Sequence, residues 1–214
     1  MNFKLAIFDL DGTLLDTSEG IFGTANKAVV QLGLSAVEDR AQLAKFIGPP
    51  IAQCFINVYD LADELIDDAI AIYRTEYDQT GRFQARPYEG IEEMLVDLRS
   101  RGYALAVGTL KYEPLARQML EHFGLSQYFD SIRGSDEAST LSKADIVTAI
   151  LKELDFEASE AVLIGDTVHD EEGAQESGVA FIAVDWGFGF AKGHPQDQGM
   201  LAMARSVQEM SSLL

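Results

Sequence analysis

Two aspartates near the start of the chain stand close enough to act on one ligand. The apolar run Leu5–Phe8 ends directly in Asp9, and Asp11 follows two residues later, in the stretch FDLDGTLLDT. Neighbouring carboxylates resist ionising together unless positive charge lies between them. A plain hairpin turn is the alternative, because Asp-Gly between apolar residues is a strong turn signal. Asp9 and Asp11 therefore need other polar residues beside them before they indicate a site for chemistry.

Further polar residues follow other apolar runs, and one lysine begins a helix-like segment. These residues are Thr109, Lys111, Lys143, Asp166 and Asp170. Taken alone, Thr109 is an unremarkable strand-end residue, Asp166 could cap a helix, and Asp170 could be solvated. Lys143 could also be an exposed surface residue, but it stands in SKAD, a typical helix start, where the helix dipole disfavours a cation. A bound phosphate would explain it, because helix N-termini and lysines both attract phosphate.

Together these residues predict a site for a metal ion and a phosphate group. Asp9, Asp11 and Asp166 offer hard oxygen ligands, and Mg2+ typically takes one or two carboxylates with waters and substrate phosphate. The formal net charge of -19 would repel a small anion from the protein as a whole. A metal ion and Lys143 would supply positive charge locally, which answers that objection.

The elements that must bring these residues together are predicted to form a mostly parallel sheet. Several short runs rich in Val, Ile and Ala lack polar alternation, as strands buried on both faces do. They are FKLAIF (3–8), YALAVG (103–108), AVLIG (161–165) and VAFIAV (179–184), with SIRG (131–134) as a shorter candidate. Amphipathic helix patterns lie between them, which predicts an α/β fold with a Rossmann-like core and helices on both faces. Ligands of such sheets bind at the carboxyl ends of the strands.

The alternation of strands and helices breaks once, early in the chain. Only helix-like patterns occur between about residue 16 and residue 86, and a GPP turn at 48–50 interrupts them. A segment of roughly 70 residues is too long for an ordinary connection between strands. The sequence therefore predicts a core domain of residues 1–16 and 87–214, with an inserted α-helical domain of residues 17–86.

The last part of the chain carries two weaker patterns. WGFGF (186–190) follows the last apolar run and either borders the site or only turns the chain. Residues 201–214 are predicted to form one closing helix packed on the sheet.

Composition and charge predict a cytoplasmic protein without affinity for nucleic acid or membranes. The chain has 214 residues with 47% hydrophobic and 24% charged content, which is ordinary for a globular protein. Asp plus Glu outnumber Lys plus Arg by 35 to 16, so a nucleic-acid backbone would be repelled. The single cysteine, Cys54, cannot form an internal disulfide, and no apolar stretch approaches the length of a membrane span. The protein is expected to be a monomer or a homodimer.

The motifs and their order resemble the haloacid dehalogenase superfamily, in its phosphatase-type branch. DLDGTLLDT is similar to the first motif of that family, Thr109 to the second, Lys143 to the third and GDTVHD (165–170) to the fourth. The resemblance covers nearly the whole chain, and it includes a helical cap and the GPP turn of phosphoglycolate-phosphatase-like members. Leu110 departs from the pattern, because relatives often carry Ser or Asn there, but its backbone amide remains.

The resemblance implies Mg2+-dependent hydrolysis of a small phosphorylated metabolite through a covalent aspartyl-phosphate. Asp9 would attack the phosphorus. Asp11 would protonate the leaving oxygen and then deprotonate the water that hydrolyses the intermediate. Mg2+ would be held by Asp9, the backbone carbonyl of Asp11, and Asp166, and Asp170 would complete or orient that shell.

The resemblance also implies residues for the phosphate group and for the rest of the substrate. Thr109, the amide of Leu110, and Lys143 would contact phosphoryl oxygens and stabilise their charge in the transition state. Three residues of the cap are candidates for contact with the leaving group: Lys45, Gly48 and Pro49.

Several other activities remain as alternatives. A 5′-nucleotide or pyrophosphate suits the same site chemistry as phosphoglycolate. Dehalogenases and phosphonatases are disfavoured because those branches lack the second aspartate, which is Asp11 here. A β-phosphoglucomutase shares both aspartates, but that branch usually has a histidine where this chain has Ile21. A regulator that kept the fold and lost turnover is the non-enzyme alternative, and the intact pair of aspartates argues against it.

Overall fold

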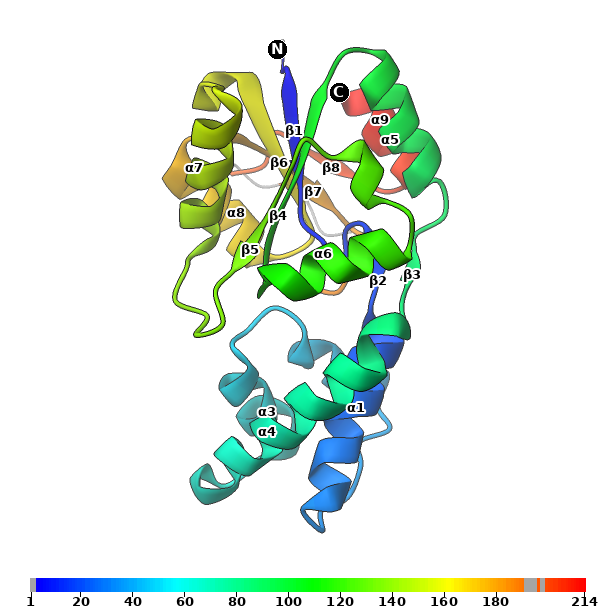
Figure 1. The fold of residues 1–214 in the computed structure, drawn as a ribbon, viewed down its shortest axis with the longest axis vertical. Helices are drawn as coiled ribbons and strands as arrows, with labels where there is room; N and C mark the ends of the chain where they lie inside the picture. The colour runs from blue at the N-terminus through cyan, green and yellow to red at the C-terminus, as the bar shows by residue number, and fades with distance from the viewer. Residues whose placement is uncertain (1–2, 191–195, 197–198) are drawn as a thin grey trace. The chain divides into compact units, whose positions relative to one another are not determined.

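The chain forms two compact units in a computed structural model that describes residues 3–190, 196 and 199–214 (Figure 1). One unit consists of Met1–Asp16 and Pro87–Leu214, and the other of Thr17–Arg86. The first contains a large parallel sheet with flanking helices, and the second is helical.

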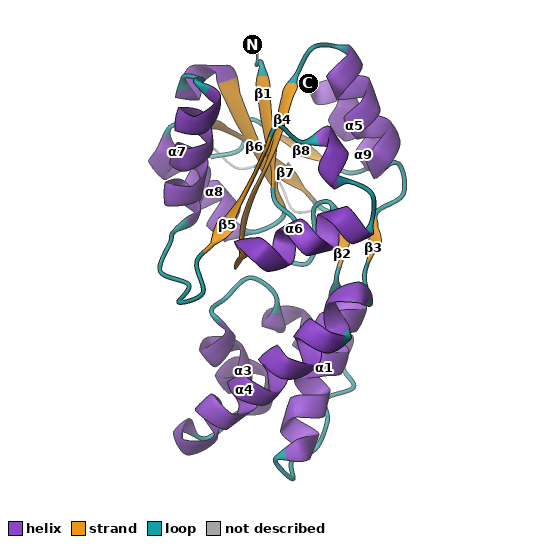
Figure 2. Cartoon of the chain, in the orientation of Figure 1, coloured by secondary structure: helices purple, strands orange, loops and turns teal. Residues whose placement is uncertain are grey.

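A six-stranded sheet forms the centre of the first unit (Figure 2). The strand order is β5-β4-β1-β6-β7-β8, and the pairings are parallel. The strands are β1 (Leu5–Phe8), β4 (Ala104–Tyr112), β5 (Ser131–Ser135), β6 (Ala161–Gly165), β7 (Ala180–Val184) and β8 (Ala202–Ala204). The predicted α/β fold is therefore confirmed, and each of the five predicted runs is a strand of this sheet.

The first strand lies in the middle of the sheet because it is apolar on both faces. Every residue of β1 is at most 1% exposed, and Ile7 packs in a cluster with Ala106, Leu163 and Ile146. Burying one such aliphatic side chain contributes roughly 1.5–3 kcal/mol. The hairpin alternative is wrong, because β1 pairs with β4 and β6 and not with the segment that follows it.

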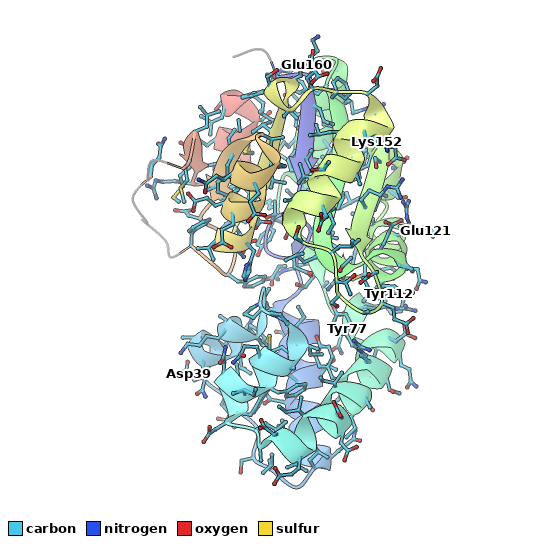
Figure 3. The ribbon with its side chains drawn as sticks, turned by 90° about the vertical axis from the view of Figure 1, so that its left-hand side faces the viewer. Asp39, Tyr77, Tyr112, Glu121, Lys152 and Glu160 are labelled. Atoms are coloured by element: carbon cyan, nitrogen blue, oxygen red, sulfur yellow. The ribbon has the colours of Figure 1, made fainter. Side chains whose placement is uncertain are left out.

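Helices cover both faces of the sheet. They are α5 (Ile91–Ser100), α6 (Glu113–His122), α7 (Lys143–Leu154), α8 (Val168–Ser177) and α9 (Val207–Leu213), with short 3-10 turns η3 (Ser126–Tyr128) and η4 (Ala158–Glu160). The helices α7 and α8 lie side by side on one side of the sheet, and α5 and α9 lie on the other (Figure 1). Lys152, for example, lies on the exposed face of α7 (Figure 3).

The prediction of one closing helix over residues 201–214 is wrong in its first part. Residues Ala202–Ala204 form β8, which pairs in parallel with β7 from Ile182 to Val184. The helix begins only at Val207, where the Ser206 hydroxyl accepts a hydrogen bond from the Glu209 amide. Pairing with the open edge of β7 outweighs the helix propensity of Ala and Met in this stretch.

The second unit is built from helices, as the sequence predicts for this stretch. They are α1 (Ser18–Gln31), α2 (Arg40–Leu43), α3 (Ile51–Tyr59) and α4 (Asp63–Gln79), with 3-10 turns η1 (Ala44–Phe46) and η2 (Gly81–Phe83). Aromatic rings form part of its core, since the Phe46 ring centroid lies 4.9 Å from that of Phe55 and 5.5 Å from that of Tyr73. The short strands β2 (Leu15–Asp16) and β3 (Arg86–Pro87) pair where the chain enters and leaves this unit.

In the part of the chain that the structure describes, no helix combines the length and the apolar character needed to cross a bilayer.

Candidate active site

Strand register places the predicted site residues at the carboxyl ends of the central strands. Phe8, the last residue of β1, pairs with Val107 of β4 and with Ile164 of β6. The Asp9 amide continues this ladder and donates to the Ile164 carbonyl oxygen at 2.8 Å. Asp9 follows β1 and Asp166 follows β6 at this level, and Thr109 lies within β4 two residues after Val107, so all three lie at the carboxyl end of the paired segments, as the parallel arrangement predicts.

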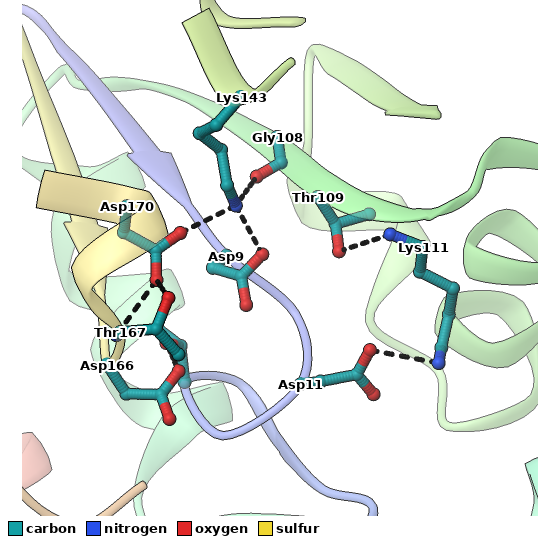
Figure 4. Close-up of polar contacts among 10 residues, drawn as sticks. Asp9, Asp11, Gly108, Thr109, Lys111, Lys143, Asp166, Thr167 and Asp170 are labelled. Carbon is teal, nitrogen blue, oxygen red and sulfur yellow. Dashed lines mark hydrogen bonds and ion pairs between the residues drawn. The ribbon is translucent and has the colours of Figure 1, made fainter. Parts of the chain in front are cut away.

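Lys143 lies inside the site and not on the surface. It is 4% exposed, and its Nζ lies 2.6 Å from Asp9 Oδ1 and 2.7 Å from Asp170 Oδ1 (Figure 4). Nζ also donates to the Gly108 carbonyl oxygen at 2.8 Å. The solvated alternative for this lysine is wrong, and two carboxylates offset the unfavourable helix dipole. The helix start itself is fixed by Ser142, whose hydroxyl caps α7.

Asp166 is held by the loop that follows β7. Its Oδ2 accepts hydrogen bonds from the backbone amides of Phe188 (2.7 Å) and Gly189 (3.3 Å), and Thr13 Oγ1 donates to Oδ1 at 3.4 Å. A Cβ atom at Gly187 would lie 2.3 Å from Oδ2, so the loop needs glycine to approach the carboxylate this closely. The WGFGF segment therefore borders the site.

Asp170 is buried and does two jobs at the start of α8. Its Oδ2 accepts hydrogen bonds from the Thr167 amide (3.0 Å) and the Thr167 hydroxyl (2.8 Å), which forms a capping box. Its Oδ1 pairs with Lys143. The solvated alternative for Asp170 is wrong, since the residue is 1% exposed. A Cβ atom at Gly165 would lie 2.3 Å from Asp170 Cγ, so this glycine also makes room for a carboxylate.

Three carboxylates of the site stand close enough to bind one metal ion. One oxygen from each of Asp9, Asp166 and Asp170 can be chosen so that all lie within 4.8 Å of one another, and all three residues are buried. Oxygen donors without nitrogen or sulfur suit hard cations such as Mg2+ and Ca2+ better than zinc. The donor set therefore fits a divalent metal.

The electrostatics of the cluster show a shortage of positive charge. Burial raises the pKa of Asp9 to about 7, Lys143 opposes that rise, and Asp170 and Asp11 add to it. Burial, together with the charges of Asp170 and Asp9, raises the pKa of Asp166 well above its usual value. Burial alone would lower the pKa of Lys143, but Asp170 and Asp9 raise it above the ordinary lysine value. A bound cation would relieve the repulsion among these carboxylates.

Asp11 and Thr109 form a second group beside this cluster. The Asp11 side chain lies apart from the three metal-binding candidates and pairs with Lys111, whose Nζ is 2.9 Å from Asp11 Oδ2 (Figure 4). Thr109 Oγ1 accepts a hydrogen bond from the Lys111 amide at 3.2 Å. Leu110 is half-buried and packs its side chain against the hydrophobic core. The structure therefore brings six predicted site residues together at the carboxyl ends of the central strands: Asp9, Asp11, Thr109, Lys143, Asp166 and Asp170.

The three cap candidates belong to the helical unit Thr17–Arg86. Lys45 lies in η1 and is exposed, and Gly48 is exposed with a φ of 108°, which favours glycine. Pro49 is half-buried and its carbonyl oxygen accepts a hydrogen bond from the Cys54 thiol at 3.2 Å.

Some contacts of the site could not be found from residue types. The donors from Phe188 and Gly189 are backbone amides, which any residue except proline would supply. The only sequence signal for them is the pair of glycines in WGFGF. The sequence also gives no sign of the contact between Thr13 and Asp166, because a threonine after Asp-Gly is equally typical of a turn.

Comparisons with known proteins agree with this arrangement. Residues 6–184 match the family model described as haloacid dehalogenase-like hydrolase. A 5′-nucleotidase of Pseudomonas aeruginosa is 38% identical over 190 residues, which is 88% of this chain and 86% of that protein. A phosphoglycolate phosphatase of Aquifex aeolicus is 31% identical over 188 residues, which is 86% of this chain and 86% of that protein.

A differently named relative and a solved structure complete the picture. The tyrosine-protein kinase PtkA of Mycobacterium tuberculosis is 37% identical over 88% of this chain, which spans only 64% of that protein. The solved structure of a haloacid dehalogenase-like family hydrolase from Streptococcus pneumoniae is 31% identical, with a TM-score of 0.90 over 99% of this chain and 98% of that one. The chain therefore belongs to the haloacid dehalogenase-like hydrolase family, which confirms the resemblance drawn from its four motifs.

Proposed function

We propose that this protein is a Mg2+-dependent phosphatase that hydrolyses a small phosphate monoester through an aspartyl-phosphate on Asp9. The proposal depends on one observation: three carboxylates and one ammonium group lie close together at the carboxyl ends of the strands, from Asp9, Asp166, Asp170 and Lys143. Clustered carboxylates and a buried lysine suit a metal ion with an anionic substrate beside it. The relatives named 5′-nucleotidase and phosphoglycolate phosphatase support the same reaction type.

In the first half-reaction, a carboxylate oxygen of Asp9 bonds to phosphorus and the bond from phosphorus to the leaving oxygen breaks. The leaving oxygen takes a proton from the carboxyl group of Asp11. Lys143 holds Asp9 Oδ1 at 2.6 Å, so we assign the attack to Oδ2. Thr109 Oγ1 accepts from the Lys111 amide, which leaves the hydroxyl hydrogen to be donated to a phosphoryl oxygen. The Leu110 amide is the other proposed donor. Lys143, whose three N–H groups are engaged by Asp9, Asp170 and Gly108, contributes its positive charge beside the phosphoryl group.

In the second half-reaction, a water oxygen bonds to phosphorus and the bond from phosphorus to Asp9 breaks. Asp11 takes a proton from that water and so regains the proton it gave to the leaving group. The products are inorganic phosphate and the original Asp9 carboxylate, and each residue returns to its starting state.

The proposed metal ligands are Asp9, the backbone carbonyl of Asp11, and Asp166. A divalent cation bound there would reduce the repulsion between the nucleophile and the anionic phosphoryl group. Both oxygens of Asp170 are already engaged, one with Lys143 and the other with Thr167, so its proposed part is to orient Lys143. Asp166 is fixed in direction by the two backbone amides that bind it.

The substrate proposal has two candidates with different support. The phosphoglycolate-phosphatase-like motifs favour a small phosphorylated acid, and the relative at 38% identity favours a 5′-nucleotide. We propose that the helical unit acts as a cap that selects the leaving group through Lys45, Gly48 and Pro49. Lys45 is exposed and cationic, which suits a carboxylate or a second anionic group on the substrate.

Kinetics on a panel of phosphate esters test the activity and the substrate together. The panel compares 2-phosphoglycolate, 5′-nucleotides and pyrophosphate by kcat/KM with Mg2+ present, and Lys45→Met should change the ranking. A tyrosine peptide with ATP completes the panel, because one relative is named a tyrosine-protein kinase. Peptide phosphorylation without phosphate release would contradict the proposal.

Replacing the nucleophile is the sharper test of mechanism. Asp9→Asn should lower kcat on p-nitrophenyl phosphate by about a thousandfold or more, because asparagine cannot form the acyl phosphate. Asp67→Asn, at an exposed position of α4, is a matched control that should keep wild-type activity. Equal activity of the Asp9→Asn variant and the wild type would exclude the mechanism.

A further inference from the structure

Lys111 links two residues of the candidate site. Its Nζ lies 2.9 Å from Asp11 Oδ2, and its backbone amide donates to Thr109 Oγ1 (Figure 4). The side chains of Lys111 and Asp11 are 9% and 15% exposed. The ion pair is thus shielded from water and screened less than a surface pair. A shielded pair can fix the direction of the Asp11 carboxylate.

An irregularity in β4 brings Lys111 to this position. The register between β4 and β5 shifts between Gly108 and Tyr112, so that Gly134 of β5 alone lies opposite three residues of β4. A Cβ atom at Gly134 would lie 2.5 Å from the Lys111 carbonyl oxygen, so only glycine lets the two backbones approach this closely. Bulges of this kind re-aim side chains and are frequent next to active sites.

The two oxygens of Asp11 have different surroundings. Oδ2 is bound by Lys111. Oδ1 is shielded from solvent and has no hydrogen-bond partner among the residues that the structure describes. A buried carboxylate oxygen without a partner is costly, and such groups often mark a functional role. Lys111 therefore holds one oxygen and leaves the other able to accept a proton.

We propose that Lys111 is a positioning residue that holds the Asp11 carboxylate for the water step of the reaction. The inference rests on the proposed function. Lys111 binds Asp11 through Oδ2 in the structure. Once Asp11 has given the proton on Oδ1 to the leaving group, the same contact holds the resulting carboxylate while Oδ1 takes a proton from the attacking water. The water oxygen bonds to phosphorus as the bond from phosphorus to Asp9 breaks. Lys111 itself neither gains nor loses a proton.

Steady-state and rapid-mixing kinetics of Lys111→Met test this role. Methionine keeps the backbone amide that binds Thr109 and removes only the ammonium group. With a covalent intermediate, kcat/KM reports the steps up to release of the leaving group, whereas kcat also includes breakdown of the intermediate. Two substrates that differ in leaving group, p-nitrophenyl phosphate and phenyl phosphate, are compared with Mg2+ present. The comparison separates release of the leaving group from breakdown of the intermediate.

We expect a split between kcat and kcat/KM. Slower breakdown should lower kcat by about tenfold or more, to one common value for both substrates. KM should fall with kcat, so that kcat/KM changes by less than about twofold. A burst of p-nitrophenol should precede the steady state, because the aspartyl-phosphate accumulates. A purely structural role of Lys111 would lower both parameters together and give no burst.

Controls separate this inference from the proposed function. Lys152→Met removes an exposed lysine of α7 and should behave as the wild type. Lys111→Gln is measured in parallel, with thermal melting of each variant, so that a misfolded methionine variant does not decide the result. Wild-type kcat, or a parallel loss of kcat and kcat/KM in a folded variant, would overturn the role of Lys111. Full activity of Asp9→Asn would instead overturn the proposed function.

Discussion

Lys143 Nζ lies 2.6 Å from Asp9 Oδ1 in the interior of the protein, where the lysine is 4% and the aspartate 7% exposed. The two residues are 134 positions apart, since Lys143 begins α7 and Asp9 directly follows β1. Lys143 also pairs with Asp170 at 2.7 Å. The same ammonium therefore links α7 to the residue that follows β1 and offsets the charge of the proposed nucleophile.

Removing Lys143 should cost both stability and activity. In Lys143→Met, two buried carboxylates lose their cationic partner, which typically costs roughly 3–5 kcal/mol. Urea unfolding without metal should show this loss, and phosphate release from p-nitrophenyl phosphate should fall by about a hundredfold or more. Lys152→Met on the same helix is the control and should change neither quantity. A Lys143→Met variant with unchanged midpoint and activity would show that the buried ion pairs contribute little.

The raised pKa of Asp9 should be visible in the pH dependence of stability. Between the ordinary value of 3.8 and about 7, the folded protein keeps a proton on Asp9 that the unfolded chain has lost. The contribution of Asp9 to the free energy of unfolding therefore falls as the pH rises through this window. In metal-free urea titrations, Asp9→Asn should gain stability relative to the wild type over that range and show a constant difference above it. A difference that is constant with pH would contradict the assignment.

Metal binding should stabilise the folded protein through the carboxylate cluster. A ligand present at 100 times its Kd stabilises a protein by about 2.7 kcal/mol. Added Mg2+ should therefore raise the Tm of the wild type above that in NaCl of equal ionic strength. Asp166→Asn should abolish most of this rise. Asp185→Asn is the matched control, because Asp185 is also buried but pairs with Arg205 outside the cluster, and this variant should keep the rise.

The glycine loop beside Asp166 should be sensitive to a single methyl group. In Gly187→Ala, the new Cβ atom would meet Asp166 Oδ2 at 2.3 Å, so the carboxylate or the loop must move. We expect weaker Mg2+ binding in isothermal titration calorimetry and about tenfold lower kcat/KM. Gly23→Ala is the control, since its Cβ has room in α1 and should stabilise the helix by roughly 0.5–1 kcal/mol. Tight Mg2+ binding by Gly187→Ala would show that the loop does not position Asp166.

The sequence predicts the sheet and the position of the site at the carboxyl ends of its strands, because both follow from local patterns. Strands buried on two faces are continuous apolar runs, and parallel strands bring their carboxyl ends to one side. These two rules together bring Asp9, Thr109 and Asp166 to one place. The strand β8 follows from neither rule, because its three residues form a strand only where β7 offers an unpaired edge, which no local pattern reveals.

The finer geometry of the site depends on backbone features that residue types do not encode. The pairing of Lys111 with Asp11 requires a register shift in β4, and the sequence shows only a lysine two residues after a threonine. Likewise, backbone amides of the WGFGF segment hold the Asp166 carboxylate, and the side chains of that segment do not reveal which amides donate. The burial of Lys143 is a tertiary effect too, because its helix start alone is typical of a solvated position.

The covalent state of Asp9 during turnover is the most direct measure of whether this residue is the nucleophile. Wild-type protein and Lys111→Met are mixed with p-nitrophenyl phosphate and Mg2+, quenched in acid within the first turnovers, digested and analysed by mass spectrometry. We expect one phosphoryl group on Asp9, at higher occupancy in Lys111→Met, and none in Asp9→Asn. Continued release of inorganic phosphate by both active proteins, with Asp9 unmodified at every quench time, would contradict it.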